Sequence, residues 1–243
     1  MKKRRSPSPR PSRKRARATQ GGQPLVVMKF GGSSLAPRPR VAGALLAETQ
    51  ESGAPSVEEL YLGLRRTLEK ATVARFAEVA RHIGSQAAEG RQAVVVVSAI
   101  GDTTDELITL AEDVTAHPDR RELDMLVATG EQSSAALMAM TLNALGWPAL
   151  SLTGGQAGIL AEPVPGRAHI RSVHPDRIRR ELGQGKTVVV AGFQGITEQD
   201  AAADLTTLGR GGSDASAAAL AVALGAECDI YTDVAGVYTA DPR

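Results

Sequence analysis

The sequence predicts an α/β protein, a three-layer αβα sandwich with a mostly parallel central sheet. Two continuous apolar runs, at 93–99 and 187–193, have the β-branched composition of strands that are buried on both faces. Segments with helical spacing of apolar residues alternate with such runs, which is typical of a parallel sheet covered by helices on both sides. Aromatic residues make up only 3% of the 243 residues, which argues against an aromatic-rich β-sandwich.

The first part of the chain supplies strands and helices in alternation. The expected elements are, in order, a strand at 25–30, helices at 56–70 and 71–88, a strand at 93–99, a helix capped near Thr103 or Thr104, and a helix at 121–145. Ser56 carries the hydroxyl that a helix N-cap needs. Gly130 is the one position at which we expect the last of these helices to be interrupted.

The second part continues the same alternation. The expected elements are strands at 148–152 and 168–173, a helix at 175–182, a strand at 187–193, a helix at 213–224 and a strand at 228–234. No internal repeat is visible, so one α/β domain of ordinary size is expected.

The N-terminal segment differs from the rest in charge. Residues 1–24 carry nine of the 28 Lys and Arg residues and none of the 27 Asp and Glu residues, so the remainder has a net charge of −8. The segment is rich in Pro and Ser and nearly free of apolar residues, which predicts a disordered basic tail. A solvated extension is the plainer interpretation, and a nucleic-acid tether or nuclear signal is the alternative.

Cys228 is the only cysteine, which excludes an internal disulfide and a zinc site built on a cysteine pair. Its apolar neighbours predict a buried structural thiol, and a reducing cytoplasmic location is expected. No apolar run approaches the ~18 residues that a membrane span needs.

Glycine-rich turns recur where the predicted strands end. Gly31 and Gly32 follow the first strand, and the stretch 209–212 precedes a helix. Because ligands of open α/β sheets bind at the carboxyl ends of the strands, these turns are candidate phosphate cradles. No lysine follows the second turn as in a P-loop, and Lys29 is the available cation. Taken alone, each feature is equally compatible with an ordinary loop and a solvated lysine.

Six segments taken together resemble the aspartate kinases of the amino acid kinase family. The resemblance covers nearly all of residues 25–243, and the order and spacing of the segments make chance improbable. The segments are KFGGSSL (29–35), VVVVSAIGDTTDEL (94–107), LDMLVATGEQSSAALMAMTLNALG (123–146), SLTGGQAGI (151–159), VVAGFQGI (189–196) and TTLGRGGSDASAAALAVALGAECDIYTDVAGVYTADPR (206–243).

The resemblance implies phosphoryl transfer from Mg-ATP to the side-chain carboxylate of L-aspartate, which gives 4-phospho-L-aspartate. This is the first step toward lysine, threonine and methionine. Aspartate carries two carboxylates and an ammonium, so its site needs an arginine, an acid and neutral donors. Catalysis of such a transfer is mainly positioning and charge neutralisation.

The resemblance also implies roles for single residues. Lys29 matches the lysine that stabilises the transferring phosphoryl group, and Asp214 matches the aspartate that holds Lys29. Arg210 matches the arginine that binds the α-carboxylate, and Glu131 the acid that pairs with the substrate ammonium. The implied substrate site consists of Ser98, Asp102, Thr103, Thr104, Asp105, Glu106, Glu131, Arg210, Gly211, Gly212 and Ser213.

Two segments of the resemblance form the implied ATP site. The residues are Lys29, Phe30, Gly31, Gly32 and Ser33 from the first, and Tyr231, Thr232, Asp233, Val237, Tyr238, Thr239, Ala240, Asp241 and Pro242 from the second. Mg²⁺ is expected to bind mainly through the nucleotide, with no metal site of the protein's own. The four histidines match no catalytic residue and are expected to be solvated or in loops.

The sequence departs from the family in three places. Residues 37–70 form a probable insertion, expected to be a surface helix. Ala215 and Ser216 replace a more usual threonine pair, and both are expected to face the helix interior. The family's kinase domain continues beyond Arg243 and is usually followed by paired ACT regulatory domains, so the chain is expected to be an incomplete kinase domain.

Several alternatives remain open on the sequence. The nearest enzymatic ones are acetylglutamate kinase and glutamate 5-kinase, which share the sheet and the glycine-rich loops. A non-catalytic ligand-binding subunit is another, because the chain is expected to lack the C-terminal part of the domain. A homo-oligomer is expected for the full-length form.

Overall fold

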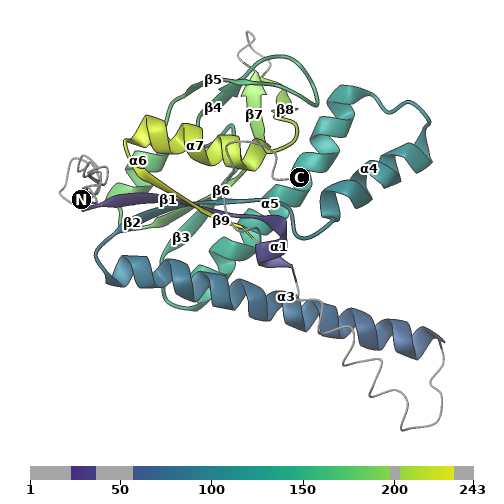
Figure 1. The fold of residues 1–243 in the computed structure, drawn as a ribbon, viewed down its shortest axis with the longest axis horizontal. Helices are drawn as coiled ribbons and strands as arrows, with labels where there is room; N and C mark the ends of the chain where they lie inside the picture. The colour runs from purple at the N-terminus through teal and green to yellow at the C-terminus, as the bar shows by residue number, and fades with distance from the viewer. Residues whose placement is uncertain (1–22, 37–56, 198–202, 233–243) are drawn as a thin grey trace, which may run out of the picture.

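The computed structural model describes residues 23–36, 57–197 and 203–232 (Figure 1). The predicted basic tail therefore lies outside the described residues, apart from Gln23 and Pro24. The same holds for residues 37–56 of the predicted insertion and for the predicted nucleotide segment from Asp233 onward. None of the described helices is long and apolar enough to cross a membrane.

The centre of the fold is a five-stranded parallel sheet with the strand order β3-β6-β2-β1-β9. Its strands are β1 (Leu25–Phe30), β2 (Gln92–Val97), β3 (Ala149–Leu152), β6 (Thr187–Ala191) and β9 (Glu227–Tyr231). The three middle strands are almost entirely buried, as their largely apolar composition predicts. Because all five strands run in one direction, their carboxyl ends meet at one edge of the sheet.

Helices cover both faces of this sheet, which confirms the predicted three layers (Figure 1). On one face, α3 (Val57–Ala88) and α5 (Arg120–Ala144) pack against side chains such as Met28 and Val95. On the other face, α6 (Asp176–Gly183) and α7 (Gly212–Leu224) pack against the alternate side chains such as Val27 and Val94. The alternation of strand side chains thus builds two separate cores.

A second, four-stranded sheet was not expected from the sequence. It has the order β5-β4-β7-β8 and consists of β4 (Ile159–Ala161), β5 (Ile170–Val173), β7 (Gln194–Thr197) and β8 (Leu205–Thr207). Only the β4–β7 pair is parallel. Since only two residues separate the end of β6 from the start of β7, this sheet extends from the carboxyl edge of the central one.

Two predicted helix boundaries were wrong. The helices expected at 56–70 and 71–88 are one continuous helix, α3, because no proline or capping signal separates them. The α5 helix runs through Gly130 without interruption. A Cβ at Gly130 would lie 2.8 Å from Ala99 Cβ, so this glycine permits a close approach of α5 to the loop after β2.

The expected burial of Cys228 was also wrong, because its side chain is exposed. It lies on β9, the edge strand of the described sheet, where residues 227–230 are all exposed. The apolar neighbours of Cys228 in the sequence therefore did not predict whether other elements cover its side chain.

Two short helices complete the described fold. They are α1 (Gly32–Leu35), which follows β1, and α4 (Thr103–Val114), which follows β2. Both begin at the carboxyl edge of the central sheet, where the glycine-rich turns also lie.

Candidate active site

Lys29 and Asp214 meet at the carboxyl edge of the central sheet. Lys29 is the fifth residue of β1 and points to the same face as Val27, toward α7. Its Nζ lies 2.8 Å from Asp214 Oδ1, in the first turn of α7. This carboxylate oxygen is buried and has no hydrogen-bond partner besides the ion pair among the described residues. The ammonium is thus held at the start of a helix, where the backbone carries partial positive charge.

The turn after β1 brings two loop backbones into contact. A Cβ on Gly32 would lie 2.7 Å from the carbonyl oxygen of Ala99, and the Gly101 N–H donates to the Gly32 carbonyl at 3.3 Å. A Cβ on Gly31 would lie 3.4 Å from Lys29 Nζ. Gly31 therefore leaves space beside the lysine ammonium that a side chain would fill, whereas Gly32 permits the close approach of the two backbones.

Glu131 lies on α5 behind this contact, and its side chain is buried. Its Oε1 accepts a hydrogen bond from the Ala99 N–H at 3.0 Å, and its Oε2 has no partner among the described residues. Burial raises the pKa of Glu131 from its ordinary value to about 7, although backbone hydrogen bonds oppose the shift. A buried carboxylate oxygen without a donor is suited to binding a cationic group.

The loop after β2 supplies several of the predicted substrate residues. The Ser98 N–H donates to the Phe30 carbonyl at 3.2 Å, and the Thr103 hydroxyl donates to the Ile100 carbonyl at 2.7 Å. Thr103 also adjoins Gly130, since a Cβ there would lie 3.6 Å from its methyl carbon. The remaining members are exposed or half-buried at the start of α4, and they are Asp102, Thr104, Asp105 and Glu106.

The turn before α7 places Arg210 between two glycines in the left-handed region, with φ of 72° at Gly209 and 74° at Gly211. The Arg210 side chain is exposed, and Ser213 is buried. A Cβ on Gly192, at the end of β6, would lie 2.9 Å from Ser213 Oγ. The β6 end and the start of α7 are thus in direct contact.

Sequence reasoning missed two residues that hold this contact. Phe193 is the only described residue other than glycine with φ in the left-handed region, at 66°. Its N–H donates to Ser216 Oγ at 3.2 Å, and the same hydroxyl donates to the Gly212 carbonyl at 2.8 Å. Ser216 is fully buried as expected, whereas Ala215 is exposed, contrary to expectation. The strained backbone at Phe193 is stabilised by these contacts.

Two predicted nucleotide residues point away from Lys29. The rings of Phe30 and Tyr231 stack at 4.6 Å on the α3 side of the sheet, and Tyr231 Oη lies 2.9 Å from His82 Nε2. Only the backbones of these residues can face a nucleotide beside Lys29. His82 is exposed, as expected, yet it contacts both rings from α3.

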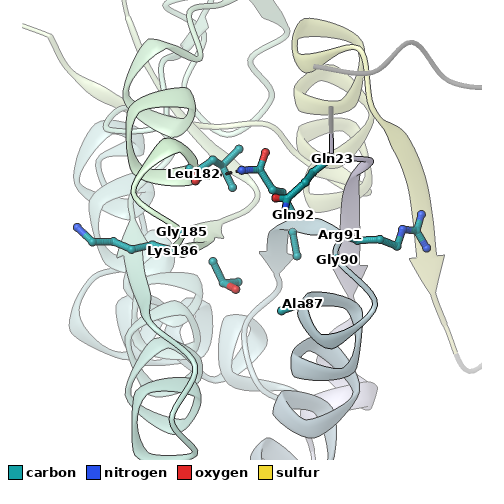
Figure 2. Close-up of a pocket in the computed structure, with 10 residues that line it drawn as sticks. Gln23, Ala87, Gly90, Arg91, Gln92, Leu182, Gly185 and Lys186 are labelled. Carbon is teal, nitrogen blue, oxygen red and sulfur yellow. Dashed lines mark hydrogen bonds between the residues drawn. The ribbon is translucent and has the colours of Figure 1, made fainter. Parts of the chain in front are cut away.

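A pocket of about 220 Å³ lies at the opposite, amino edge of the sheet, and its lining residues are drawn in Figure 2. Its two basic side chains are already paired, Arg91 with Glu227 at 2.9 Å and Lys186 with Glu181 at 2.8 Å. None of the residues that line this pocket belongs to the site around Lys29. Among the described residues, no group of three or more His, Cys, Asp and Glu side chains could hold a metal ion.

The sequence of this chain is similar to those of known kinases. Residues 24–243 match the amino acid kinase family. An aspartokinase of Bacillus sp. (strain MGA3) is 55% identical over 173 residues, which are 71% of this chain and 41% of that protein. The chain thus spans less than half the length of this curated relative.

Solved structures agree with the sequence matches. An aspartate kinase from Synechocystis superposes with a TM-score of 0.63 at 41% identity, over 90% of this chain and 30% of that one. E. coli aspartokinase III, solved in complex with aspartate and ADP, has the same TM-score at 24% identity, over 90% of this chain and 51% of that one. The second likeness shows a shared fold.

Proposed function

The chain belongs to the amino acid kinase family, and we propose that it forms the substrate and phosphoryl-transfer part of an aspartate kinase. The reaction is transfer of the γ-phosphoryl group of Mg-ATP to the side-chain carboxylate of L-aspartate. The observation that carries the proposal is the Lys29–Asp214 ion pair beside the glycine turn of β1. The similarity to an aspartokinase at 55% identity supports aspartate among the substrates of the family.

Charge neutralisation at the transferring group is assigned to Lys29. Its ammonium is fixed by Asp214, so it is oriented before any substrate binds. Gly31 leaves room beside it for phosphate oxygens to approach the backbone, and Gly32 follows at the start of α1. These residues, with Ser33, fit the phosphates of ATP, and Mg²⁺ bound to the nucleotide would add neutralising charge there.

Recognition of aspartate is assigned to residues around the same edge. Glu131 Oε2 accepts from the substrate ammonium, and the Arg210 guanidinium binds the α-carboxylate through two N–H groups. Ser98, Ser213 and the start of α4 complete the site. Glu131 and the glycine turn are linked through Ala99, whose N–H binds Glu131 and whose carbonyl adjoins Gly32.

Other parts of the assignment stay predictions. They are the adenosine contacts of residues 231–242, the boundaries of the tail and insertion, a homo-oligomer of the full-length form, and a cytoplasmic location. The substrate and nucleotide of the E. coli structure, aspartate and ADP, support the proposed pair of ligands.

The test is formation of aspartyl hydroxamate from L-aspartate, Mg-ATP and hydroxylamine, with L-glutamate and N-acetyl-L-glutamate as competing acceptors. We expect product from aspartate alone. Product from L-glutamate or N-acetyl-L-glutamate instead would assign the chain to a glutamate or acetylglutamate kinase of the same family. Because the chain is shorter than its relatives, calorimetric binding of L-aspartate is measured in parallel. Binding without turnover would support the binding-subunit alternative, and the absence of both would contradict the proposal.

A further inference from the structure

Asp124 is a carboxylate buried in the first half of α5, with only 2% of its surface exposed. Its Oδ2 accepts from the N–H of Thr207 at 2.9 Å, the N–H of Gly166 at 3.0 Å and the hydroxyl of Thr206 at 3.2 Å. Its Oδ1 accepts from the Thr207 hydroxyl at 2.8 Å. Four neutral donors thus satisfy a buried charge, and bonds to an ionised acceptor are stronger than those between neutral groups.

The donors come from two segments that flank the Arg210 turn. Thr206 and Thr207 end β8, three to four residues before Arg210. Gly166 lies in the turn between β4 and β5, and its carbonyl oxygen would lie 3.4 Å from a Cβ on Gly209. The Ala168 N–H also donates to the Thr207 carbonyl at 2.9 Å, which joins the two segments directly.

The Arg210 turn is closed by one backbone hydrogen bond, which the Gly212 N–H donates to the Gly209 carbonyl at 3.0 Å. Gly209 and Gly211 are both in the left-handed region, where glycine is least restricted. A bidentate contact from Arg210 to a carboxylate needs accurate placement of the guanidinium. The hydrogen bonds at the end of β8 therefore tie the residues just before this turn to α5, which also carries Glu131.

We propose that Asp124 is a positioning residue for aspartate recognition, which fixes the Arg210 turn relative to Glu131 through Thr206, Thr207 and Gly166. The inference rests on the proposed function, because the contact that Asp124 would position is the one between Arg210 and the α-carboxylate of the substrate. A merely structural role of Asp124 would lower stability without a selective effect on aspartate.

The test compares Thr207→Val with Thr207→Ser in the whole chain. Valine matches threonine in shape but removes the hydroxyl that Asp124 Oδ1 accepts from, whereas serine keeps it. The matched control is Asp119→Ala, which removes the N-cap of the same helix, where Asp119 accepts from the N–H groups of Arg121 and Glu122. This control destabilises the start of α5 through a side chain whose two hydrogen bonds lie within α5 and do not involve Thr206, Thr207 or Gly166.

Two measurements are made on each variant. Calorimetry with L-aspartate should show an affinity about five- to tenfold lower for Thr207→Val, less than about twofold lower for Thr207→Ser, and unchanged affinity for MgADP in both. Hydrogen exchange without ligand should be faster at residues 208–212 in Thr207→Val, but not in Asp119→Ala.

The two measurements separate the possible failures. Unchanged exchange at 208–212 in Thr207→Val would overturn the anchor, whatever happens to aspartate binding. Equal losses of aspartate affinity in Thr207→Val and Asp119→Ala would also overturn the inference, since they indicate general destabilisation. Faster exchange in a chain whose unmodified form binds no aspartate would leave the anchor in place and contradict the proposed function, and with it the assigned role in recognition.

Discussion

Lys29 Nζ and Asp214 Oδ1 lie 2.8 Å apart, and this ion pair joins the end of β1 to the first turn of α7. The lysine side chain is 11% exposed, whereas the aspartate side chain is 49% exposed. A pair with one partner so exposed contributes only about 0–1 kcal/mol to stability. The pair therefore has more consequence for the position of a charge at the sheet edge than for the free energy of unfolding.

The first prediction concerns Lys29. We expect Lys29→Met to lower the rate of aspartyl hydroxamate formation by about 10²–10³-fold, as for loss of one preorganised group that stabilises transition-state charge. We expect Asp214→Asn, which frees the ammonium without removing it, to have a smaller effect. Steady-state rates and thermal unfolding of each variant are measured together.

The matched control is Lys186→Met. Lys186 also forms an ion pair at 2.8 Å, with Glu181, but at the opposite edge of the sheet. We expect it to leave the rate unchanged. A rate loss of similar size in Lys186→Met and Lys29→Met would contradict a catalytic role for Lys29.

The sequence predicted the parts of the fold that depend on long or unbroken patterns. The central strands β2 and β6 were recognised because both faces are apolar. The second sheet was missed because strands as short as β4 and β8, of three residues each, show no periodicity. Its residues become strands through pairing with distant segments, which a local pattern does not record.

The site was predictable to the extent that it follows the family motifs. The resemblance anticipated that Asp214 holds Lys29, and the structure brings the two together. It did not anticipate Ser216 as the partner of Phe193, or Asp124 as the anchor of β8. Both contacts join segments that are far apart in the sequence. A serine or an aspartate in a helix is also common, so the residue type alone does not indicate such a contact.

A second prediction concerns glycine at the site. We expect Gly32→Ala to destabilise the chain by about 1–3 kcal/mol, because its Cβ would meet the Ala99 carbonyl at 2.7 Å and backbone atoms cannot swing aside. Gly183→Ala is the control, because a Cβ in the last turn of α6 meets nothing within 4 Å. It should stabilise by about 0.5–1 kcal/mol. Urea unfolding of both variants tests this, and equal shifts would show that Gly32 needs no close approach.

A third prediction follows from the pKa of Glu131, which is about 7 in the folded chain against an ordinary value of 4.5. Between these values the folded state binds more protons than the unfolded state, so this group's contribution to stability is present below about pH 4.5 and is lost as the pH rises through about 7. The loss is on the order of 3 kcal/mol. Glu131→Gln should therefore gain stability relative to the unmodified chain over this range.

Urea unfolding at several pH values measures this difference. Glu106→Gln is the control, because Glu106 is exposed on α4. The free energy of unfolding of this variant should change with pH in the same way as that of the unmodified chain. If the free energy of unfolding of Glu131→Gln also followed that of the unmodified chain at every pH, burial would not destabilise the ionised Glu131 carboxylate.

A fourth prediction concerns how aspartate affinity depends on pH. The substrate ammonium pairs with ionised Glu131, so binding must displace any proton that the carboxyl holds. Affinity for L-aspartate should fall by up to about tenfold per pH unit below about 7, and binding at pH 7 should release about half a proton. Calorimetry in buffers of different ionisation enthalpy counts that proton.

Succinate and Glu131→Gln separate this effect from other titrations. Succinate has both carboxylates of aspartate but no ammonium, so its binding should release no proton at Glu131. Glu131→Gln should bind L-aspartate about 30-fold or more weakly, since the buried ammonium loses its ionic partner, and its affinity should not vary with pH through this group. Proton release that is equal for succinate and aspartate would place the substrate ammonium away from Glu131. Release that persists in Glu131→Gln would assign the titrating group elsewhere.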